Sequence, residues 1–306
     1  MFLDLKDINR EIATNARAFA TASDKELKSR IDGIAKDIIA NENCKVILIS
    51  GPSGSGKTTS AMLLQKSLES FGHKAHALSL DNYFHTMTAE EKQLFAQNKI
   101  DLESPNRVDI DFLNSQLDDI INFKEVNLPR FDFKENVRKA SGKTLKLKEG
   151  ELVILEGIHA LNPDVITIPD KFDTRIYVSV RTRVKTEANG LIHPEYIRLL
   201  RRMLRDRVHR ARSFASTAAI YKSVQRGENL YIMPYKPRAN YDIDTFLPYE
   251  INVYKQLIYD GLCKEGVDTK MPKLISLLQN ALPAPTDIVP KQSLIREFIG
   301  NGEFEY

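Results

Sequence analysis

Residues 51–58 read Gly-Pro-Ser-Gly-Ser-Gly-Lys-Thr, a complete match to the phosphate-binding pattern G-x-x-x-x-G-K-S/T. An apolar run at 45–50 precedes this stretch and a helical pattern begins near Lys57, which gives the strand–loop–helix context that the pattern needs. Glycines let the backbone wrap around phosphate oxygens, and the amides at a helix N-terminus favour an anion. We therefore expect a nucleoside triphosphate to bind here.

The polar side chains of this loop are expected to have separate roles. Lys57 would reach the β- and γ-phosphates, and the Thr58 hydroxyl would ligate Mg²⁺. We expect the phosphate donor to be ATP or GTP. The residues expected to contact it are Gly51, Ser53, Gly54, Ser55, Gly56, Lys57, Thr58 and Thr59.

Strand and helix patterns alternate along the chain. Strands are predicted at 45–50, 75–80, 126–133, 151–157, 173–180 and 241–246, and helices at 5–41, 57–71, 88–98, 109–122, 194–212 and over much of 249–300. The basic segment around residues 141–143, Ser-Gly-Lys, is typical of a hairpin turn. The alternation predicts an α/β fold, a P-loop NTPase three-layer α/β/α sandwich with a mostly parallel sheet and helices on both faces.

The bulk composition is that of an ordinary globular protein, with 306 residues and a net charge of +3. We see no membrane span and no secretory signal, and the two cysteines lack metal spacing, which fits a reducing cytoplasm. Basic residues gather at two places, with six Lys/Arg against one Glu at 134–148 and seven Arg against one Asp at 198–212. This favours local anion binding over a nucleic-acid surface. The sequence leaves the oligomeric state open, a homo-oligomer included.

Two acidic residues end predicted strands, where ligands bind in open α/β sheets. Asp81 is a candidate base that accepts a proton from an attacking hydroxyl, and also a candidate Mg²⁺ ligand. Glu156 is a candidate for the second acidic ligand of the metal. A turn aspartate and a solvated strand-end glutamate are the alternatives.

The predicted helix at 194–212 carries arginines on one face. Arg198, Arg202 and Arg205 follow the spacing i, i+4, i+7, and Arg201 lies beside them. Such a segment would close on the triphosphate as a lid, neutralise the transferring phosphoryl group and exclude water. Arg202 and Arg205 are the catalytic candidates, and Arg198 and Arg201 the candidates for nucleotide contact. A solvated basic helix surface is the alternative.

Several motifs occur in an order that resembles the uridine kinase/phosphoribulokinase family of P-loop kinases. They are the loop at 51–58, Ser-Leu-Asp-Asn-Tyr-Phe at 79–84, Pro-Arg-Phe-Asp-Phe at 129–133, Leu-Glu-Gly-Ile-His-Ala-Leu at 155–161 and Arg-Arg-Met-Leu-Arg-Asp at 201–206. The tail stretches 247–250 and 289–300 are similar to the bacterial uridine-kinase-like branch, related to nucleoside kinases with a threonyl-tRNA-synthetase-type domain. The chain would then comprise a helical N-terminal extension (1–43), a P-loop kinase domain (44–250) and a helical C-terminal extension (251–306). The kinase domain would include a lid at about 181–230 and a substrate-side hairpin at about 126–148.

The resemblance implies roles at matching positions. Asp81 would activate a nucleoside 5′-hydroxyl near Mg²⁺, Glu156 would be the second acidic metal residue, and the Arg198–Arg205 helix would be the ATP lid. The implied substrate side consists of Asp81, Tyr83, Glu103, Phe131, Asn136 and Arg138. From spacing alone, Phe131 is nearly as well explained as a core aromatic as by stacking on a base.

Two positions depart from the family pattern. Glu103 stands where uridine–cytidine kinases have an aspartate for the ribose hydroxyls, and Asn136 stands where they have a base-recognising histidine. The resemblance as a whole implies an ATP-dependent nucleoside 5′-kinase, with uridine or cytidine as the acceptor. A kinase for another small hydroxyl compound, such as a sugar phosphate or a pantothenate-like molecule, is one alternative. A nucleotide-binding regulatory or RNA-associated protein is another.

Overall fold

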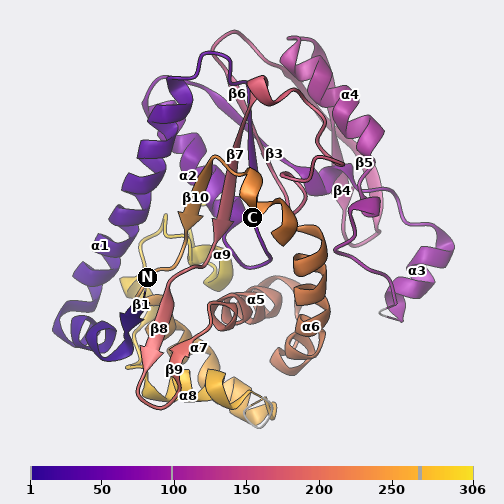
Figure 1. Ribbon diagram of the computed structural model, residues 1–306. Helices are drawn as coiled ribbons and strands as arrows, with labels where there is room; N and C mark the ends of the chain where they lie inside the picture. The colour runs from indigo at the N-terminus through magenta and orange to yellow at the C-terminus, as the bar shows by residue number, and fades with distance from the viewer. Residues whose placement is uncertain (1, 98, 268–270, 306) are drawn as a thin grey trace.

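Five parallel strands form the centre of the molecule (Figure 1). The computed structural model describes residues 2–97, 99–267 and 271–305. The strands are β2 (Val46–Ser50), β3 (Ala75–Ser79), β6 (Leu152–Glu156), β7 (Asp173–Ser179) and β10 (Tyr241–Asp244), in the order β10-β7-β2-β6-β3. Parallel pairing of every neighbouring pair brings their carboxyl ends to one edge, where the phosphate-binding loop follows β2.

Helices cover both faces of this sheet, as predicted. Side chains alternate along a strand, so Ile47 and Ile49 of β2 join one apolar cluster, while Val46 and Leu48 join another. The first cluster includes α1 (Leu5–Ile39) and α2 (Lys57–Ser70), and the second includes α4 (Ile110–Ile121). All five residues of β2 are buried, as expected for a strand covered on two faces.

The remaining helices and strands lie around the central sheet (Figure 1). Near the carboxyl ends of β7 and β10 lie α5 (Glu195–Arg210) and α6 (Phe214–Tyr231). A separate ribbon pairs β4 (Glu125–Asp132) with β5 (Val137–Lys146), and a small sheet joins β1 (Phe2–Asp4), β8 (Arg183–Thr186) and β9 (Gly190–Ile192). The remaining helices are α3 (Ala89–Ala96), α7 (Glu250–Lys264), α8 (Pro272–Asn280) and α9 (Arg296–Ile299). No helix in the described residues has the length and apolarity needed to span a membrane.

The predicted hairpin turn at residues 141–143 is wrong. Strand β5 runs through these residues, and the β4–β5 turn lies earlier, where Asn136 has φ +54°. Asn127 pairs with Thr144 and Pro129 with Ala140, so three residues of β5 face the single residue Leu128. The Ser-Gly-Lys segment is therefore a bulge, in which Gly142 takes φ +75°.

Helix α6 and the small sheet were not predicted. The long N-terminal helix α1 was predicted, but it carries a kink at Asn15, whose φ is −160° and whose ψ is 84°. Asn15 Oδ1 accepts a hydrogen bond from the Ala18 amide, so this side chain caps the second half of the helix. The two cysteines are free, in agreement with the sequence prediction.

The N-terminal helix and the C-terminal segment meet at a buried polar chain. Tyr249 donates a hydrogen bond to Asp24 on α1, and its hydroxyl also lies 2.8 Å from the Ser293 hydroxyl. Burial raises the pKa of Asp24 to about 6 although the Tyr249 hydroxyl opposes this. The carboxylate at this junction therefore makes folding dependent on pH.

Asp24→Asn is expected to stabilise the protein at pH 7 and to have little effect near pH 4. The folded pKa lies above the ordinary value of 3.8. At low pH Asp24 is protonated and its burial costs the wild type no stability, whereas the wild type loses stability as pH rises through about 6. The shift from 3.8 to about 6 predicts a gain of about 3 kcal/mol at neutral pH. Urea unfolding of both proteins at the two pH values measures this, and a gain independent of pH would contradict it.

Candidate active site

The loop between β2 and α2 is shaped by glycines in the left-handed region. Gly54 has φ +74° and Gly56 has φ +85°. A Cβ atom on Gly54 would lie 2.8 Å from the Arg198 carbonyl oxygen, and one on Gly51 would lie 1.9 Å from the Val178 oxygen. Side chains at these positions are excluded both by backbone conformation and by space. Helix α2 then begins at Lys57 and directs its N-terminal amides to the loop.

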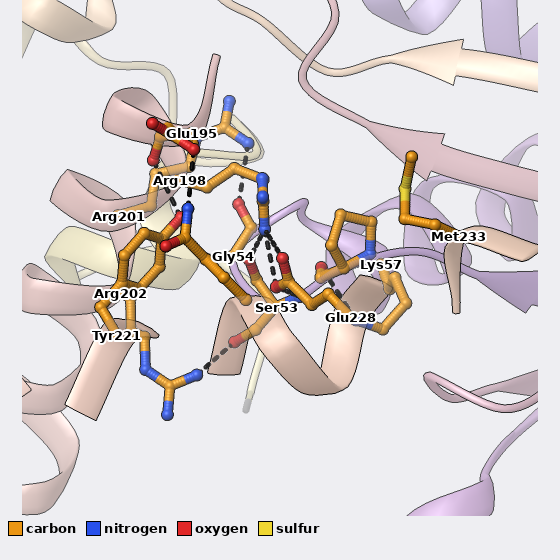
Figure 2. Close-up of polar contacts among 12 residues, drawn as sticks. Ser53, Gly54, Lys57, Glu195, Arg198, Arg201, Arg202, Tyr221, Glu228 and Met233 are labelled. Atoms are coloured by element: carbon orange, nitrogen blue, oxygen red, sulfur yellow. Dashed lines mark hydrogen bonds and ion pairs between the residues drawn. The ribbon is translucent and has the colours of Figure 1, made fainter. Parts of the chain in front are cut away.

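Three arginines of α5 converge on one loop residue, Ser53, and Figure 2 shows two of them, Arg198 and Arg202. Arg198 Nη1 lies 3.1 Å from the Ser53 carbonyl oxygen, and Arg202 Nη1 lies 2.7 Å from its hydroxyl. Arg205 Nη2 approaches the same hydroxyl at 3.5 Å. The predicted i, i+4, i+7 spacing thus places all three guanidinium groups beside the phosphate-binding loop.

Glu228 of α6 joins this group from the opposite side (Figure 2). Its carboxylate accepts hydrogen bonds from Arg198 at 2.7 and 2.8 Å and from the Ser53 amide at 2.9 Å. The Glu228 side chain is buried. The outer turn of the loop is therefore held between α5 and α6.

Arg201 faces another direction from the arginines beside it. It is fully buried and forms a two-point ion pair with Glu250, at 2.7 and 2.9 Å. Its Nη1 also lies 3.3 and 3.4 Å from the carbonyl oxygens of Gly54 and Ser55. The sequence predicted Arg201 as a nucleotide contact, whereas the structure places its guanidinium beneath the loop backbone.

Asp206 organises the arginines that follow. Its carboxylate is fully buried and pairs with Arg202, Arg205, Arg210 and Arg212 at 3.1 to 3.8 Å. Burial and the neighbouring Arg205 charge lower the pKa of Arg210 to about 10. One carboxylate for four guanidinium groups leaves a local positive surplus that an anion such as a triphosphate would relieve. Arg210 and Arg212 were not among the predicted site residues, although the count of seven arginines at 198–212 pointed to the segment.

Ser79 contacts both of the predicted strand-end acidic residues, Asp81 and Glu156. The Ser79 hydroxyl donates to Glu156 at 3.0 Å and accepts from the Asp81 amide at 3.4 Å. Burial raises the pKa of Asp81, opposed by the charges of Lys57, Arg210 and Arg205. Burial, then the Asp81 charge, raises the pKa of Glu156 to about 7, with a smaller contribution from Glu297. The structure thus brings Asp81, Glu156 and Lys57 into one electrostatic neighbourhood.

The donor set at this place fits a hard cation. Thr58, Asp81 and Glu156 offer only oxygen atoms, and two desolvated carboxylates gain from a nearby positive charge. Among the described residues no group of three or more His, Cys, Asp or Glu could hold a metal ion. The oxygen donors of Thr58, Asp81 and Glu156 are of the kind that Mg²⁺ takes, since this ion usually binds one or two carboxylates and completes its shell with phosphate and water.

The predicted acceptor residue Glu103 lies close to the donor side. Burial raises its pKa, and the charges of Arg202 and Lys57 oppose the shift. A Cβ atom on Gly227 of α6 would lie 2.4 Å from the Glu103 Cβ, so α6 packs directly on this residue. His159, which the sequence analysis did not assign a role, is buried near Tyr231 of α6, and burial lowers its pKa to about 4.

The other predicted substrate residues have partners within the protein. Phe131 stacks edge-on with Phe84 and Phe133, at 5.7 and 5.2 Å between ring centroids. Arg138 pairs with Asp109 at 2.8 Å. Tyr83 is buried and donates to Gln116 at 2.9 Å, and Asn136 lies in the β4–β5 turn, where its carbonyl accepts from the Met87 amide. Tyr83 and Asn136 therefore have structural contacts that sequence reasoning did not predict.

A parallel sheet with this loop after its central strand defines a P-loop kinase fold. The family model "Phosphoribulokinase / Uridine kinase family" matches residues 46–248. The chain belongs to this family. It is 34% identical over 198 residues to uridine kinases of Staphylococcus aureus, among them those of strains JH9 and Newman, and the match covers 64% of this chain and 84% of theirs.

A solved structure has the same fold at low identity. It is a kinase from Silicibacter sp. TM1040 assigned to a fructose transport system, with a TM-score of 0.50 and 14% identity over 69% of this chain and 98% of that one. Membership of the family makes the protein an ATP-dependent phosphotransferase with a hydroxyl group as acceptor.

Glu250→Ala is expected to destabilise the protein by about 3–5 kcal/mol, because it leaves the buried Arg201 charge without its partner. The matched control is Asp242→Asn, which removes the exposed pair with Arg181 and should cost less than about 1 kcal/mol. Urea unfolding followed by circular dichroism measures both. Equal, small losses would show that the buried pair contributes no more than the exposed one.

Proposed function

We propose that the protein phosphorylates the 5′-hydroxyl of a pyrimidine nucleoside, uridine or cytidine, and forms the nucleoside monophosphate and ADP. The observation that carries this proposal is the grouping of two partly buried carboxylates, Asp81 and Glu103, beside Lys57 and Arg202. The 34% identity to the uridine kinases of Staphylococcus aureus supports the choice of acceptor. The activity would belong to pyrimidine salvage.

On the donor side, the loop and α5 would bind the triphosphate of ATP. The amides at the start of α2 and the Lys57 ammonium would contact the phosphates, and Arg202 and Arg205 would neutralise charge on the transferring group. Thr58, Asp81 and Glu156 would hold Mg²⁺, which would offset the negative charge of the phosphates when bound.

On the acceptor side, Asp81 would accept the proton of the nucleoside hydroxyl as its oxygen attacks the γ-phosphorus. The bond between the γ-phosphorus and the β,γ-bridging oxygen breaks, and ADP leaves with that oxygen. Glu103 would accept hydrogen bonds from the sugar hydroxyls. Helix α6, packed on Glu103 and on Ser53, would exclude water from the acceptor position.

A second candidate acceptor is another small hydroxyl compound. Two observations favour keeping it: Glu103 is longer by one methylene than the aspartate expected there, and an asparagine, Asn136, stands in place of the expected histidine. Both positions concern the acceptor, so the donor chemistry would be unchanged.

A panel of acceptors assayed with ATP and Mg²⁺ separates the two candidates. We expect ADP release stimulated by uridine or cytidine, with the monophosphate identified by mass spectrometry, and no turnover with sugars or vitamin precursors. Lys57→Ala should abolish the activity, which controls for contaminating kinases. Turnover of a sugar phosphate with all nucleosides inactive would replace the proposal by its alternative.

Asp81→Asn should lower kcat by about 10²–10⁴-fold, the usual contribution of a general base, while changing the affinity for ATP much less. Single-turnover assays and equilibrium ATP binding measure the two quantities. The matched control is Asp111→Asn on α4, an exposed aspartate that should leave both unchanged. Equal losses in turnover and in ATP affinity would count against the role of Asp81 as a base.

A further inference from the structure

The C-terminal segment at 289–300 lies against the phosphate-binding loop, although the family model ends at residue 248. Leu294 is fully buried, and a Cβ atom on Gly56 would lie 2.8 Å from its Cδ1 and Cδ2 atoms. The side chain of Leu294 therefore packs directly on the glycine at which α2 begins. This contact covers the Gly56 end of the loop with an apolar side chain of the C-terminal segment.

Helix α2 lacks a local N-terminal cap. Its N-cap residue is Gly56, which has no side chain to accept a hydrogen bond from the first amides of the helix. The amides of Lys57 and Thr58 are the ones expected to face phosphate. Thr59, one residue further on, is the third helical position, where a capping side chain usually binds.

Glu297 occupies the place of that missing cap. Its Oε2 accepts a hydrogen bond from the Thr59 hydroxyl at 2.6 Å and from the Thr59 amide at 3.4 Å. Glu297 is only 6% exposed, and its negative charge lies at the positive end of the helix dipole. A residue 238 positions away in the chain thus does what an N-cap serine or aspartate does in other helices.

The position of Glu297 is fixed by its own segment. The Arg296 guanidinium donates to the carbonyl oxygens of Thr286 and Val289, at 3.0 and 2.7 Å. Ser293 belongs to the polar chain that reaches Asp24 through Tyr249. The segment is therefore tied to α1 as well as to α2.

We propose that Glu297 is a positioning residue of the donor site, which caps α2 through Thr59 and so keeps Lys57 and Thr58 directed at the phosphates of ATP. This inference rests on the proposed function, since it requires the loop to bind ATP. It assigns a role in nucleotide binding to the C-terminal segment.

The test is the affinity of the full-length protein for ATP with Mg²⁺, measured by calorimetry. Glu297→Ala should weaken binding about tenfold, because a charge-assisted hydrogen bond at the loop is lost. Glu297→Gln should stay close to wild type, since its amide oxygen still accepts from the Thr59 hydroxyl. Thr59→Val should also weaken binding, and adding Glu297→Ala to it should cause little further loss, as expected for two residues in one contact.

The matched control is Glu303→Gln. Glu303 follows the C-terminal segment and pairs with Lys66 on the same helix. This pair is exposed and lies two turns beyond Thr59, so ATP affinity should not change. The inference is overturned if folded Glu297→Ala binds ATP like wild type, or if Glu297→Gln is as weak as Glu297→Ala. If Glu297→Ala does not fold, Thr59→Ser, which keeps the hydroxyl, must bind better than Thr59→Val. A wild type that binds no triphosphate would remove the proposed function as well.

Discussion

The buried ion pair between Arg201 and Glu250 is the interaction on which the geometry of the donor loop depends. A guanidinium taken out of water is tolerated only when its donors are satisfied, and here Glu250, Thr245 and two loop carbonyls satisfy them. The same group therefore fastens α5 to α7 and to the underside of the loop. Because its position is fixed, the neighbouring Arg198, Arg202 and Arg205 are directed to the loop's outer turn at Ser53.

The electrostatics of the site follow from this arrangement. Positive charge gathers on one side, where Asp206 holds four arginines, and negative charge gathers on the other, where the partly buried Asp81 and Glu156 interact. Neither side is neutral by itself within the described contacts. A nucleotide with a divalent cation has the complementary distribution, an anion for the arginines and a cation for the carboxylates.

The features that depend on local sequence pattern could be predicted from the sequence. The loop at 51–58, the strand ends at Asp81 and Glu156 and the shared face of Arg198, Arg202 and Arg205 follow from motif and period, and the structure has them so. Features that depend on contacts distant in sequence were missed. They are the direction of Arg201, the bond of Glu228 to the Ser53 amide, the cap supplied by Glu297 and the bulge opposite Leu128. The Ser-Gly-Lys segment looks locally like a turn, and only its pairing with β4 makes it part of a strand.

One turn of α6 contacts both halves of the site. Gly227 packs on Glu103, the adjacent Glu228 binds the Ser53 amide and Arg198, and Tyr231 donates to Asp101. A displacement of this turn would alter the surroundings of the phosphate-binding loop and of the acceptor residue at the same time. In the proposed kinase, binding of the phosphate donor and binding of the acceptor would therefore be coupled through this one turn of α6.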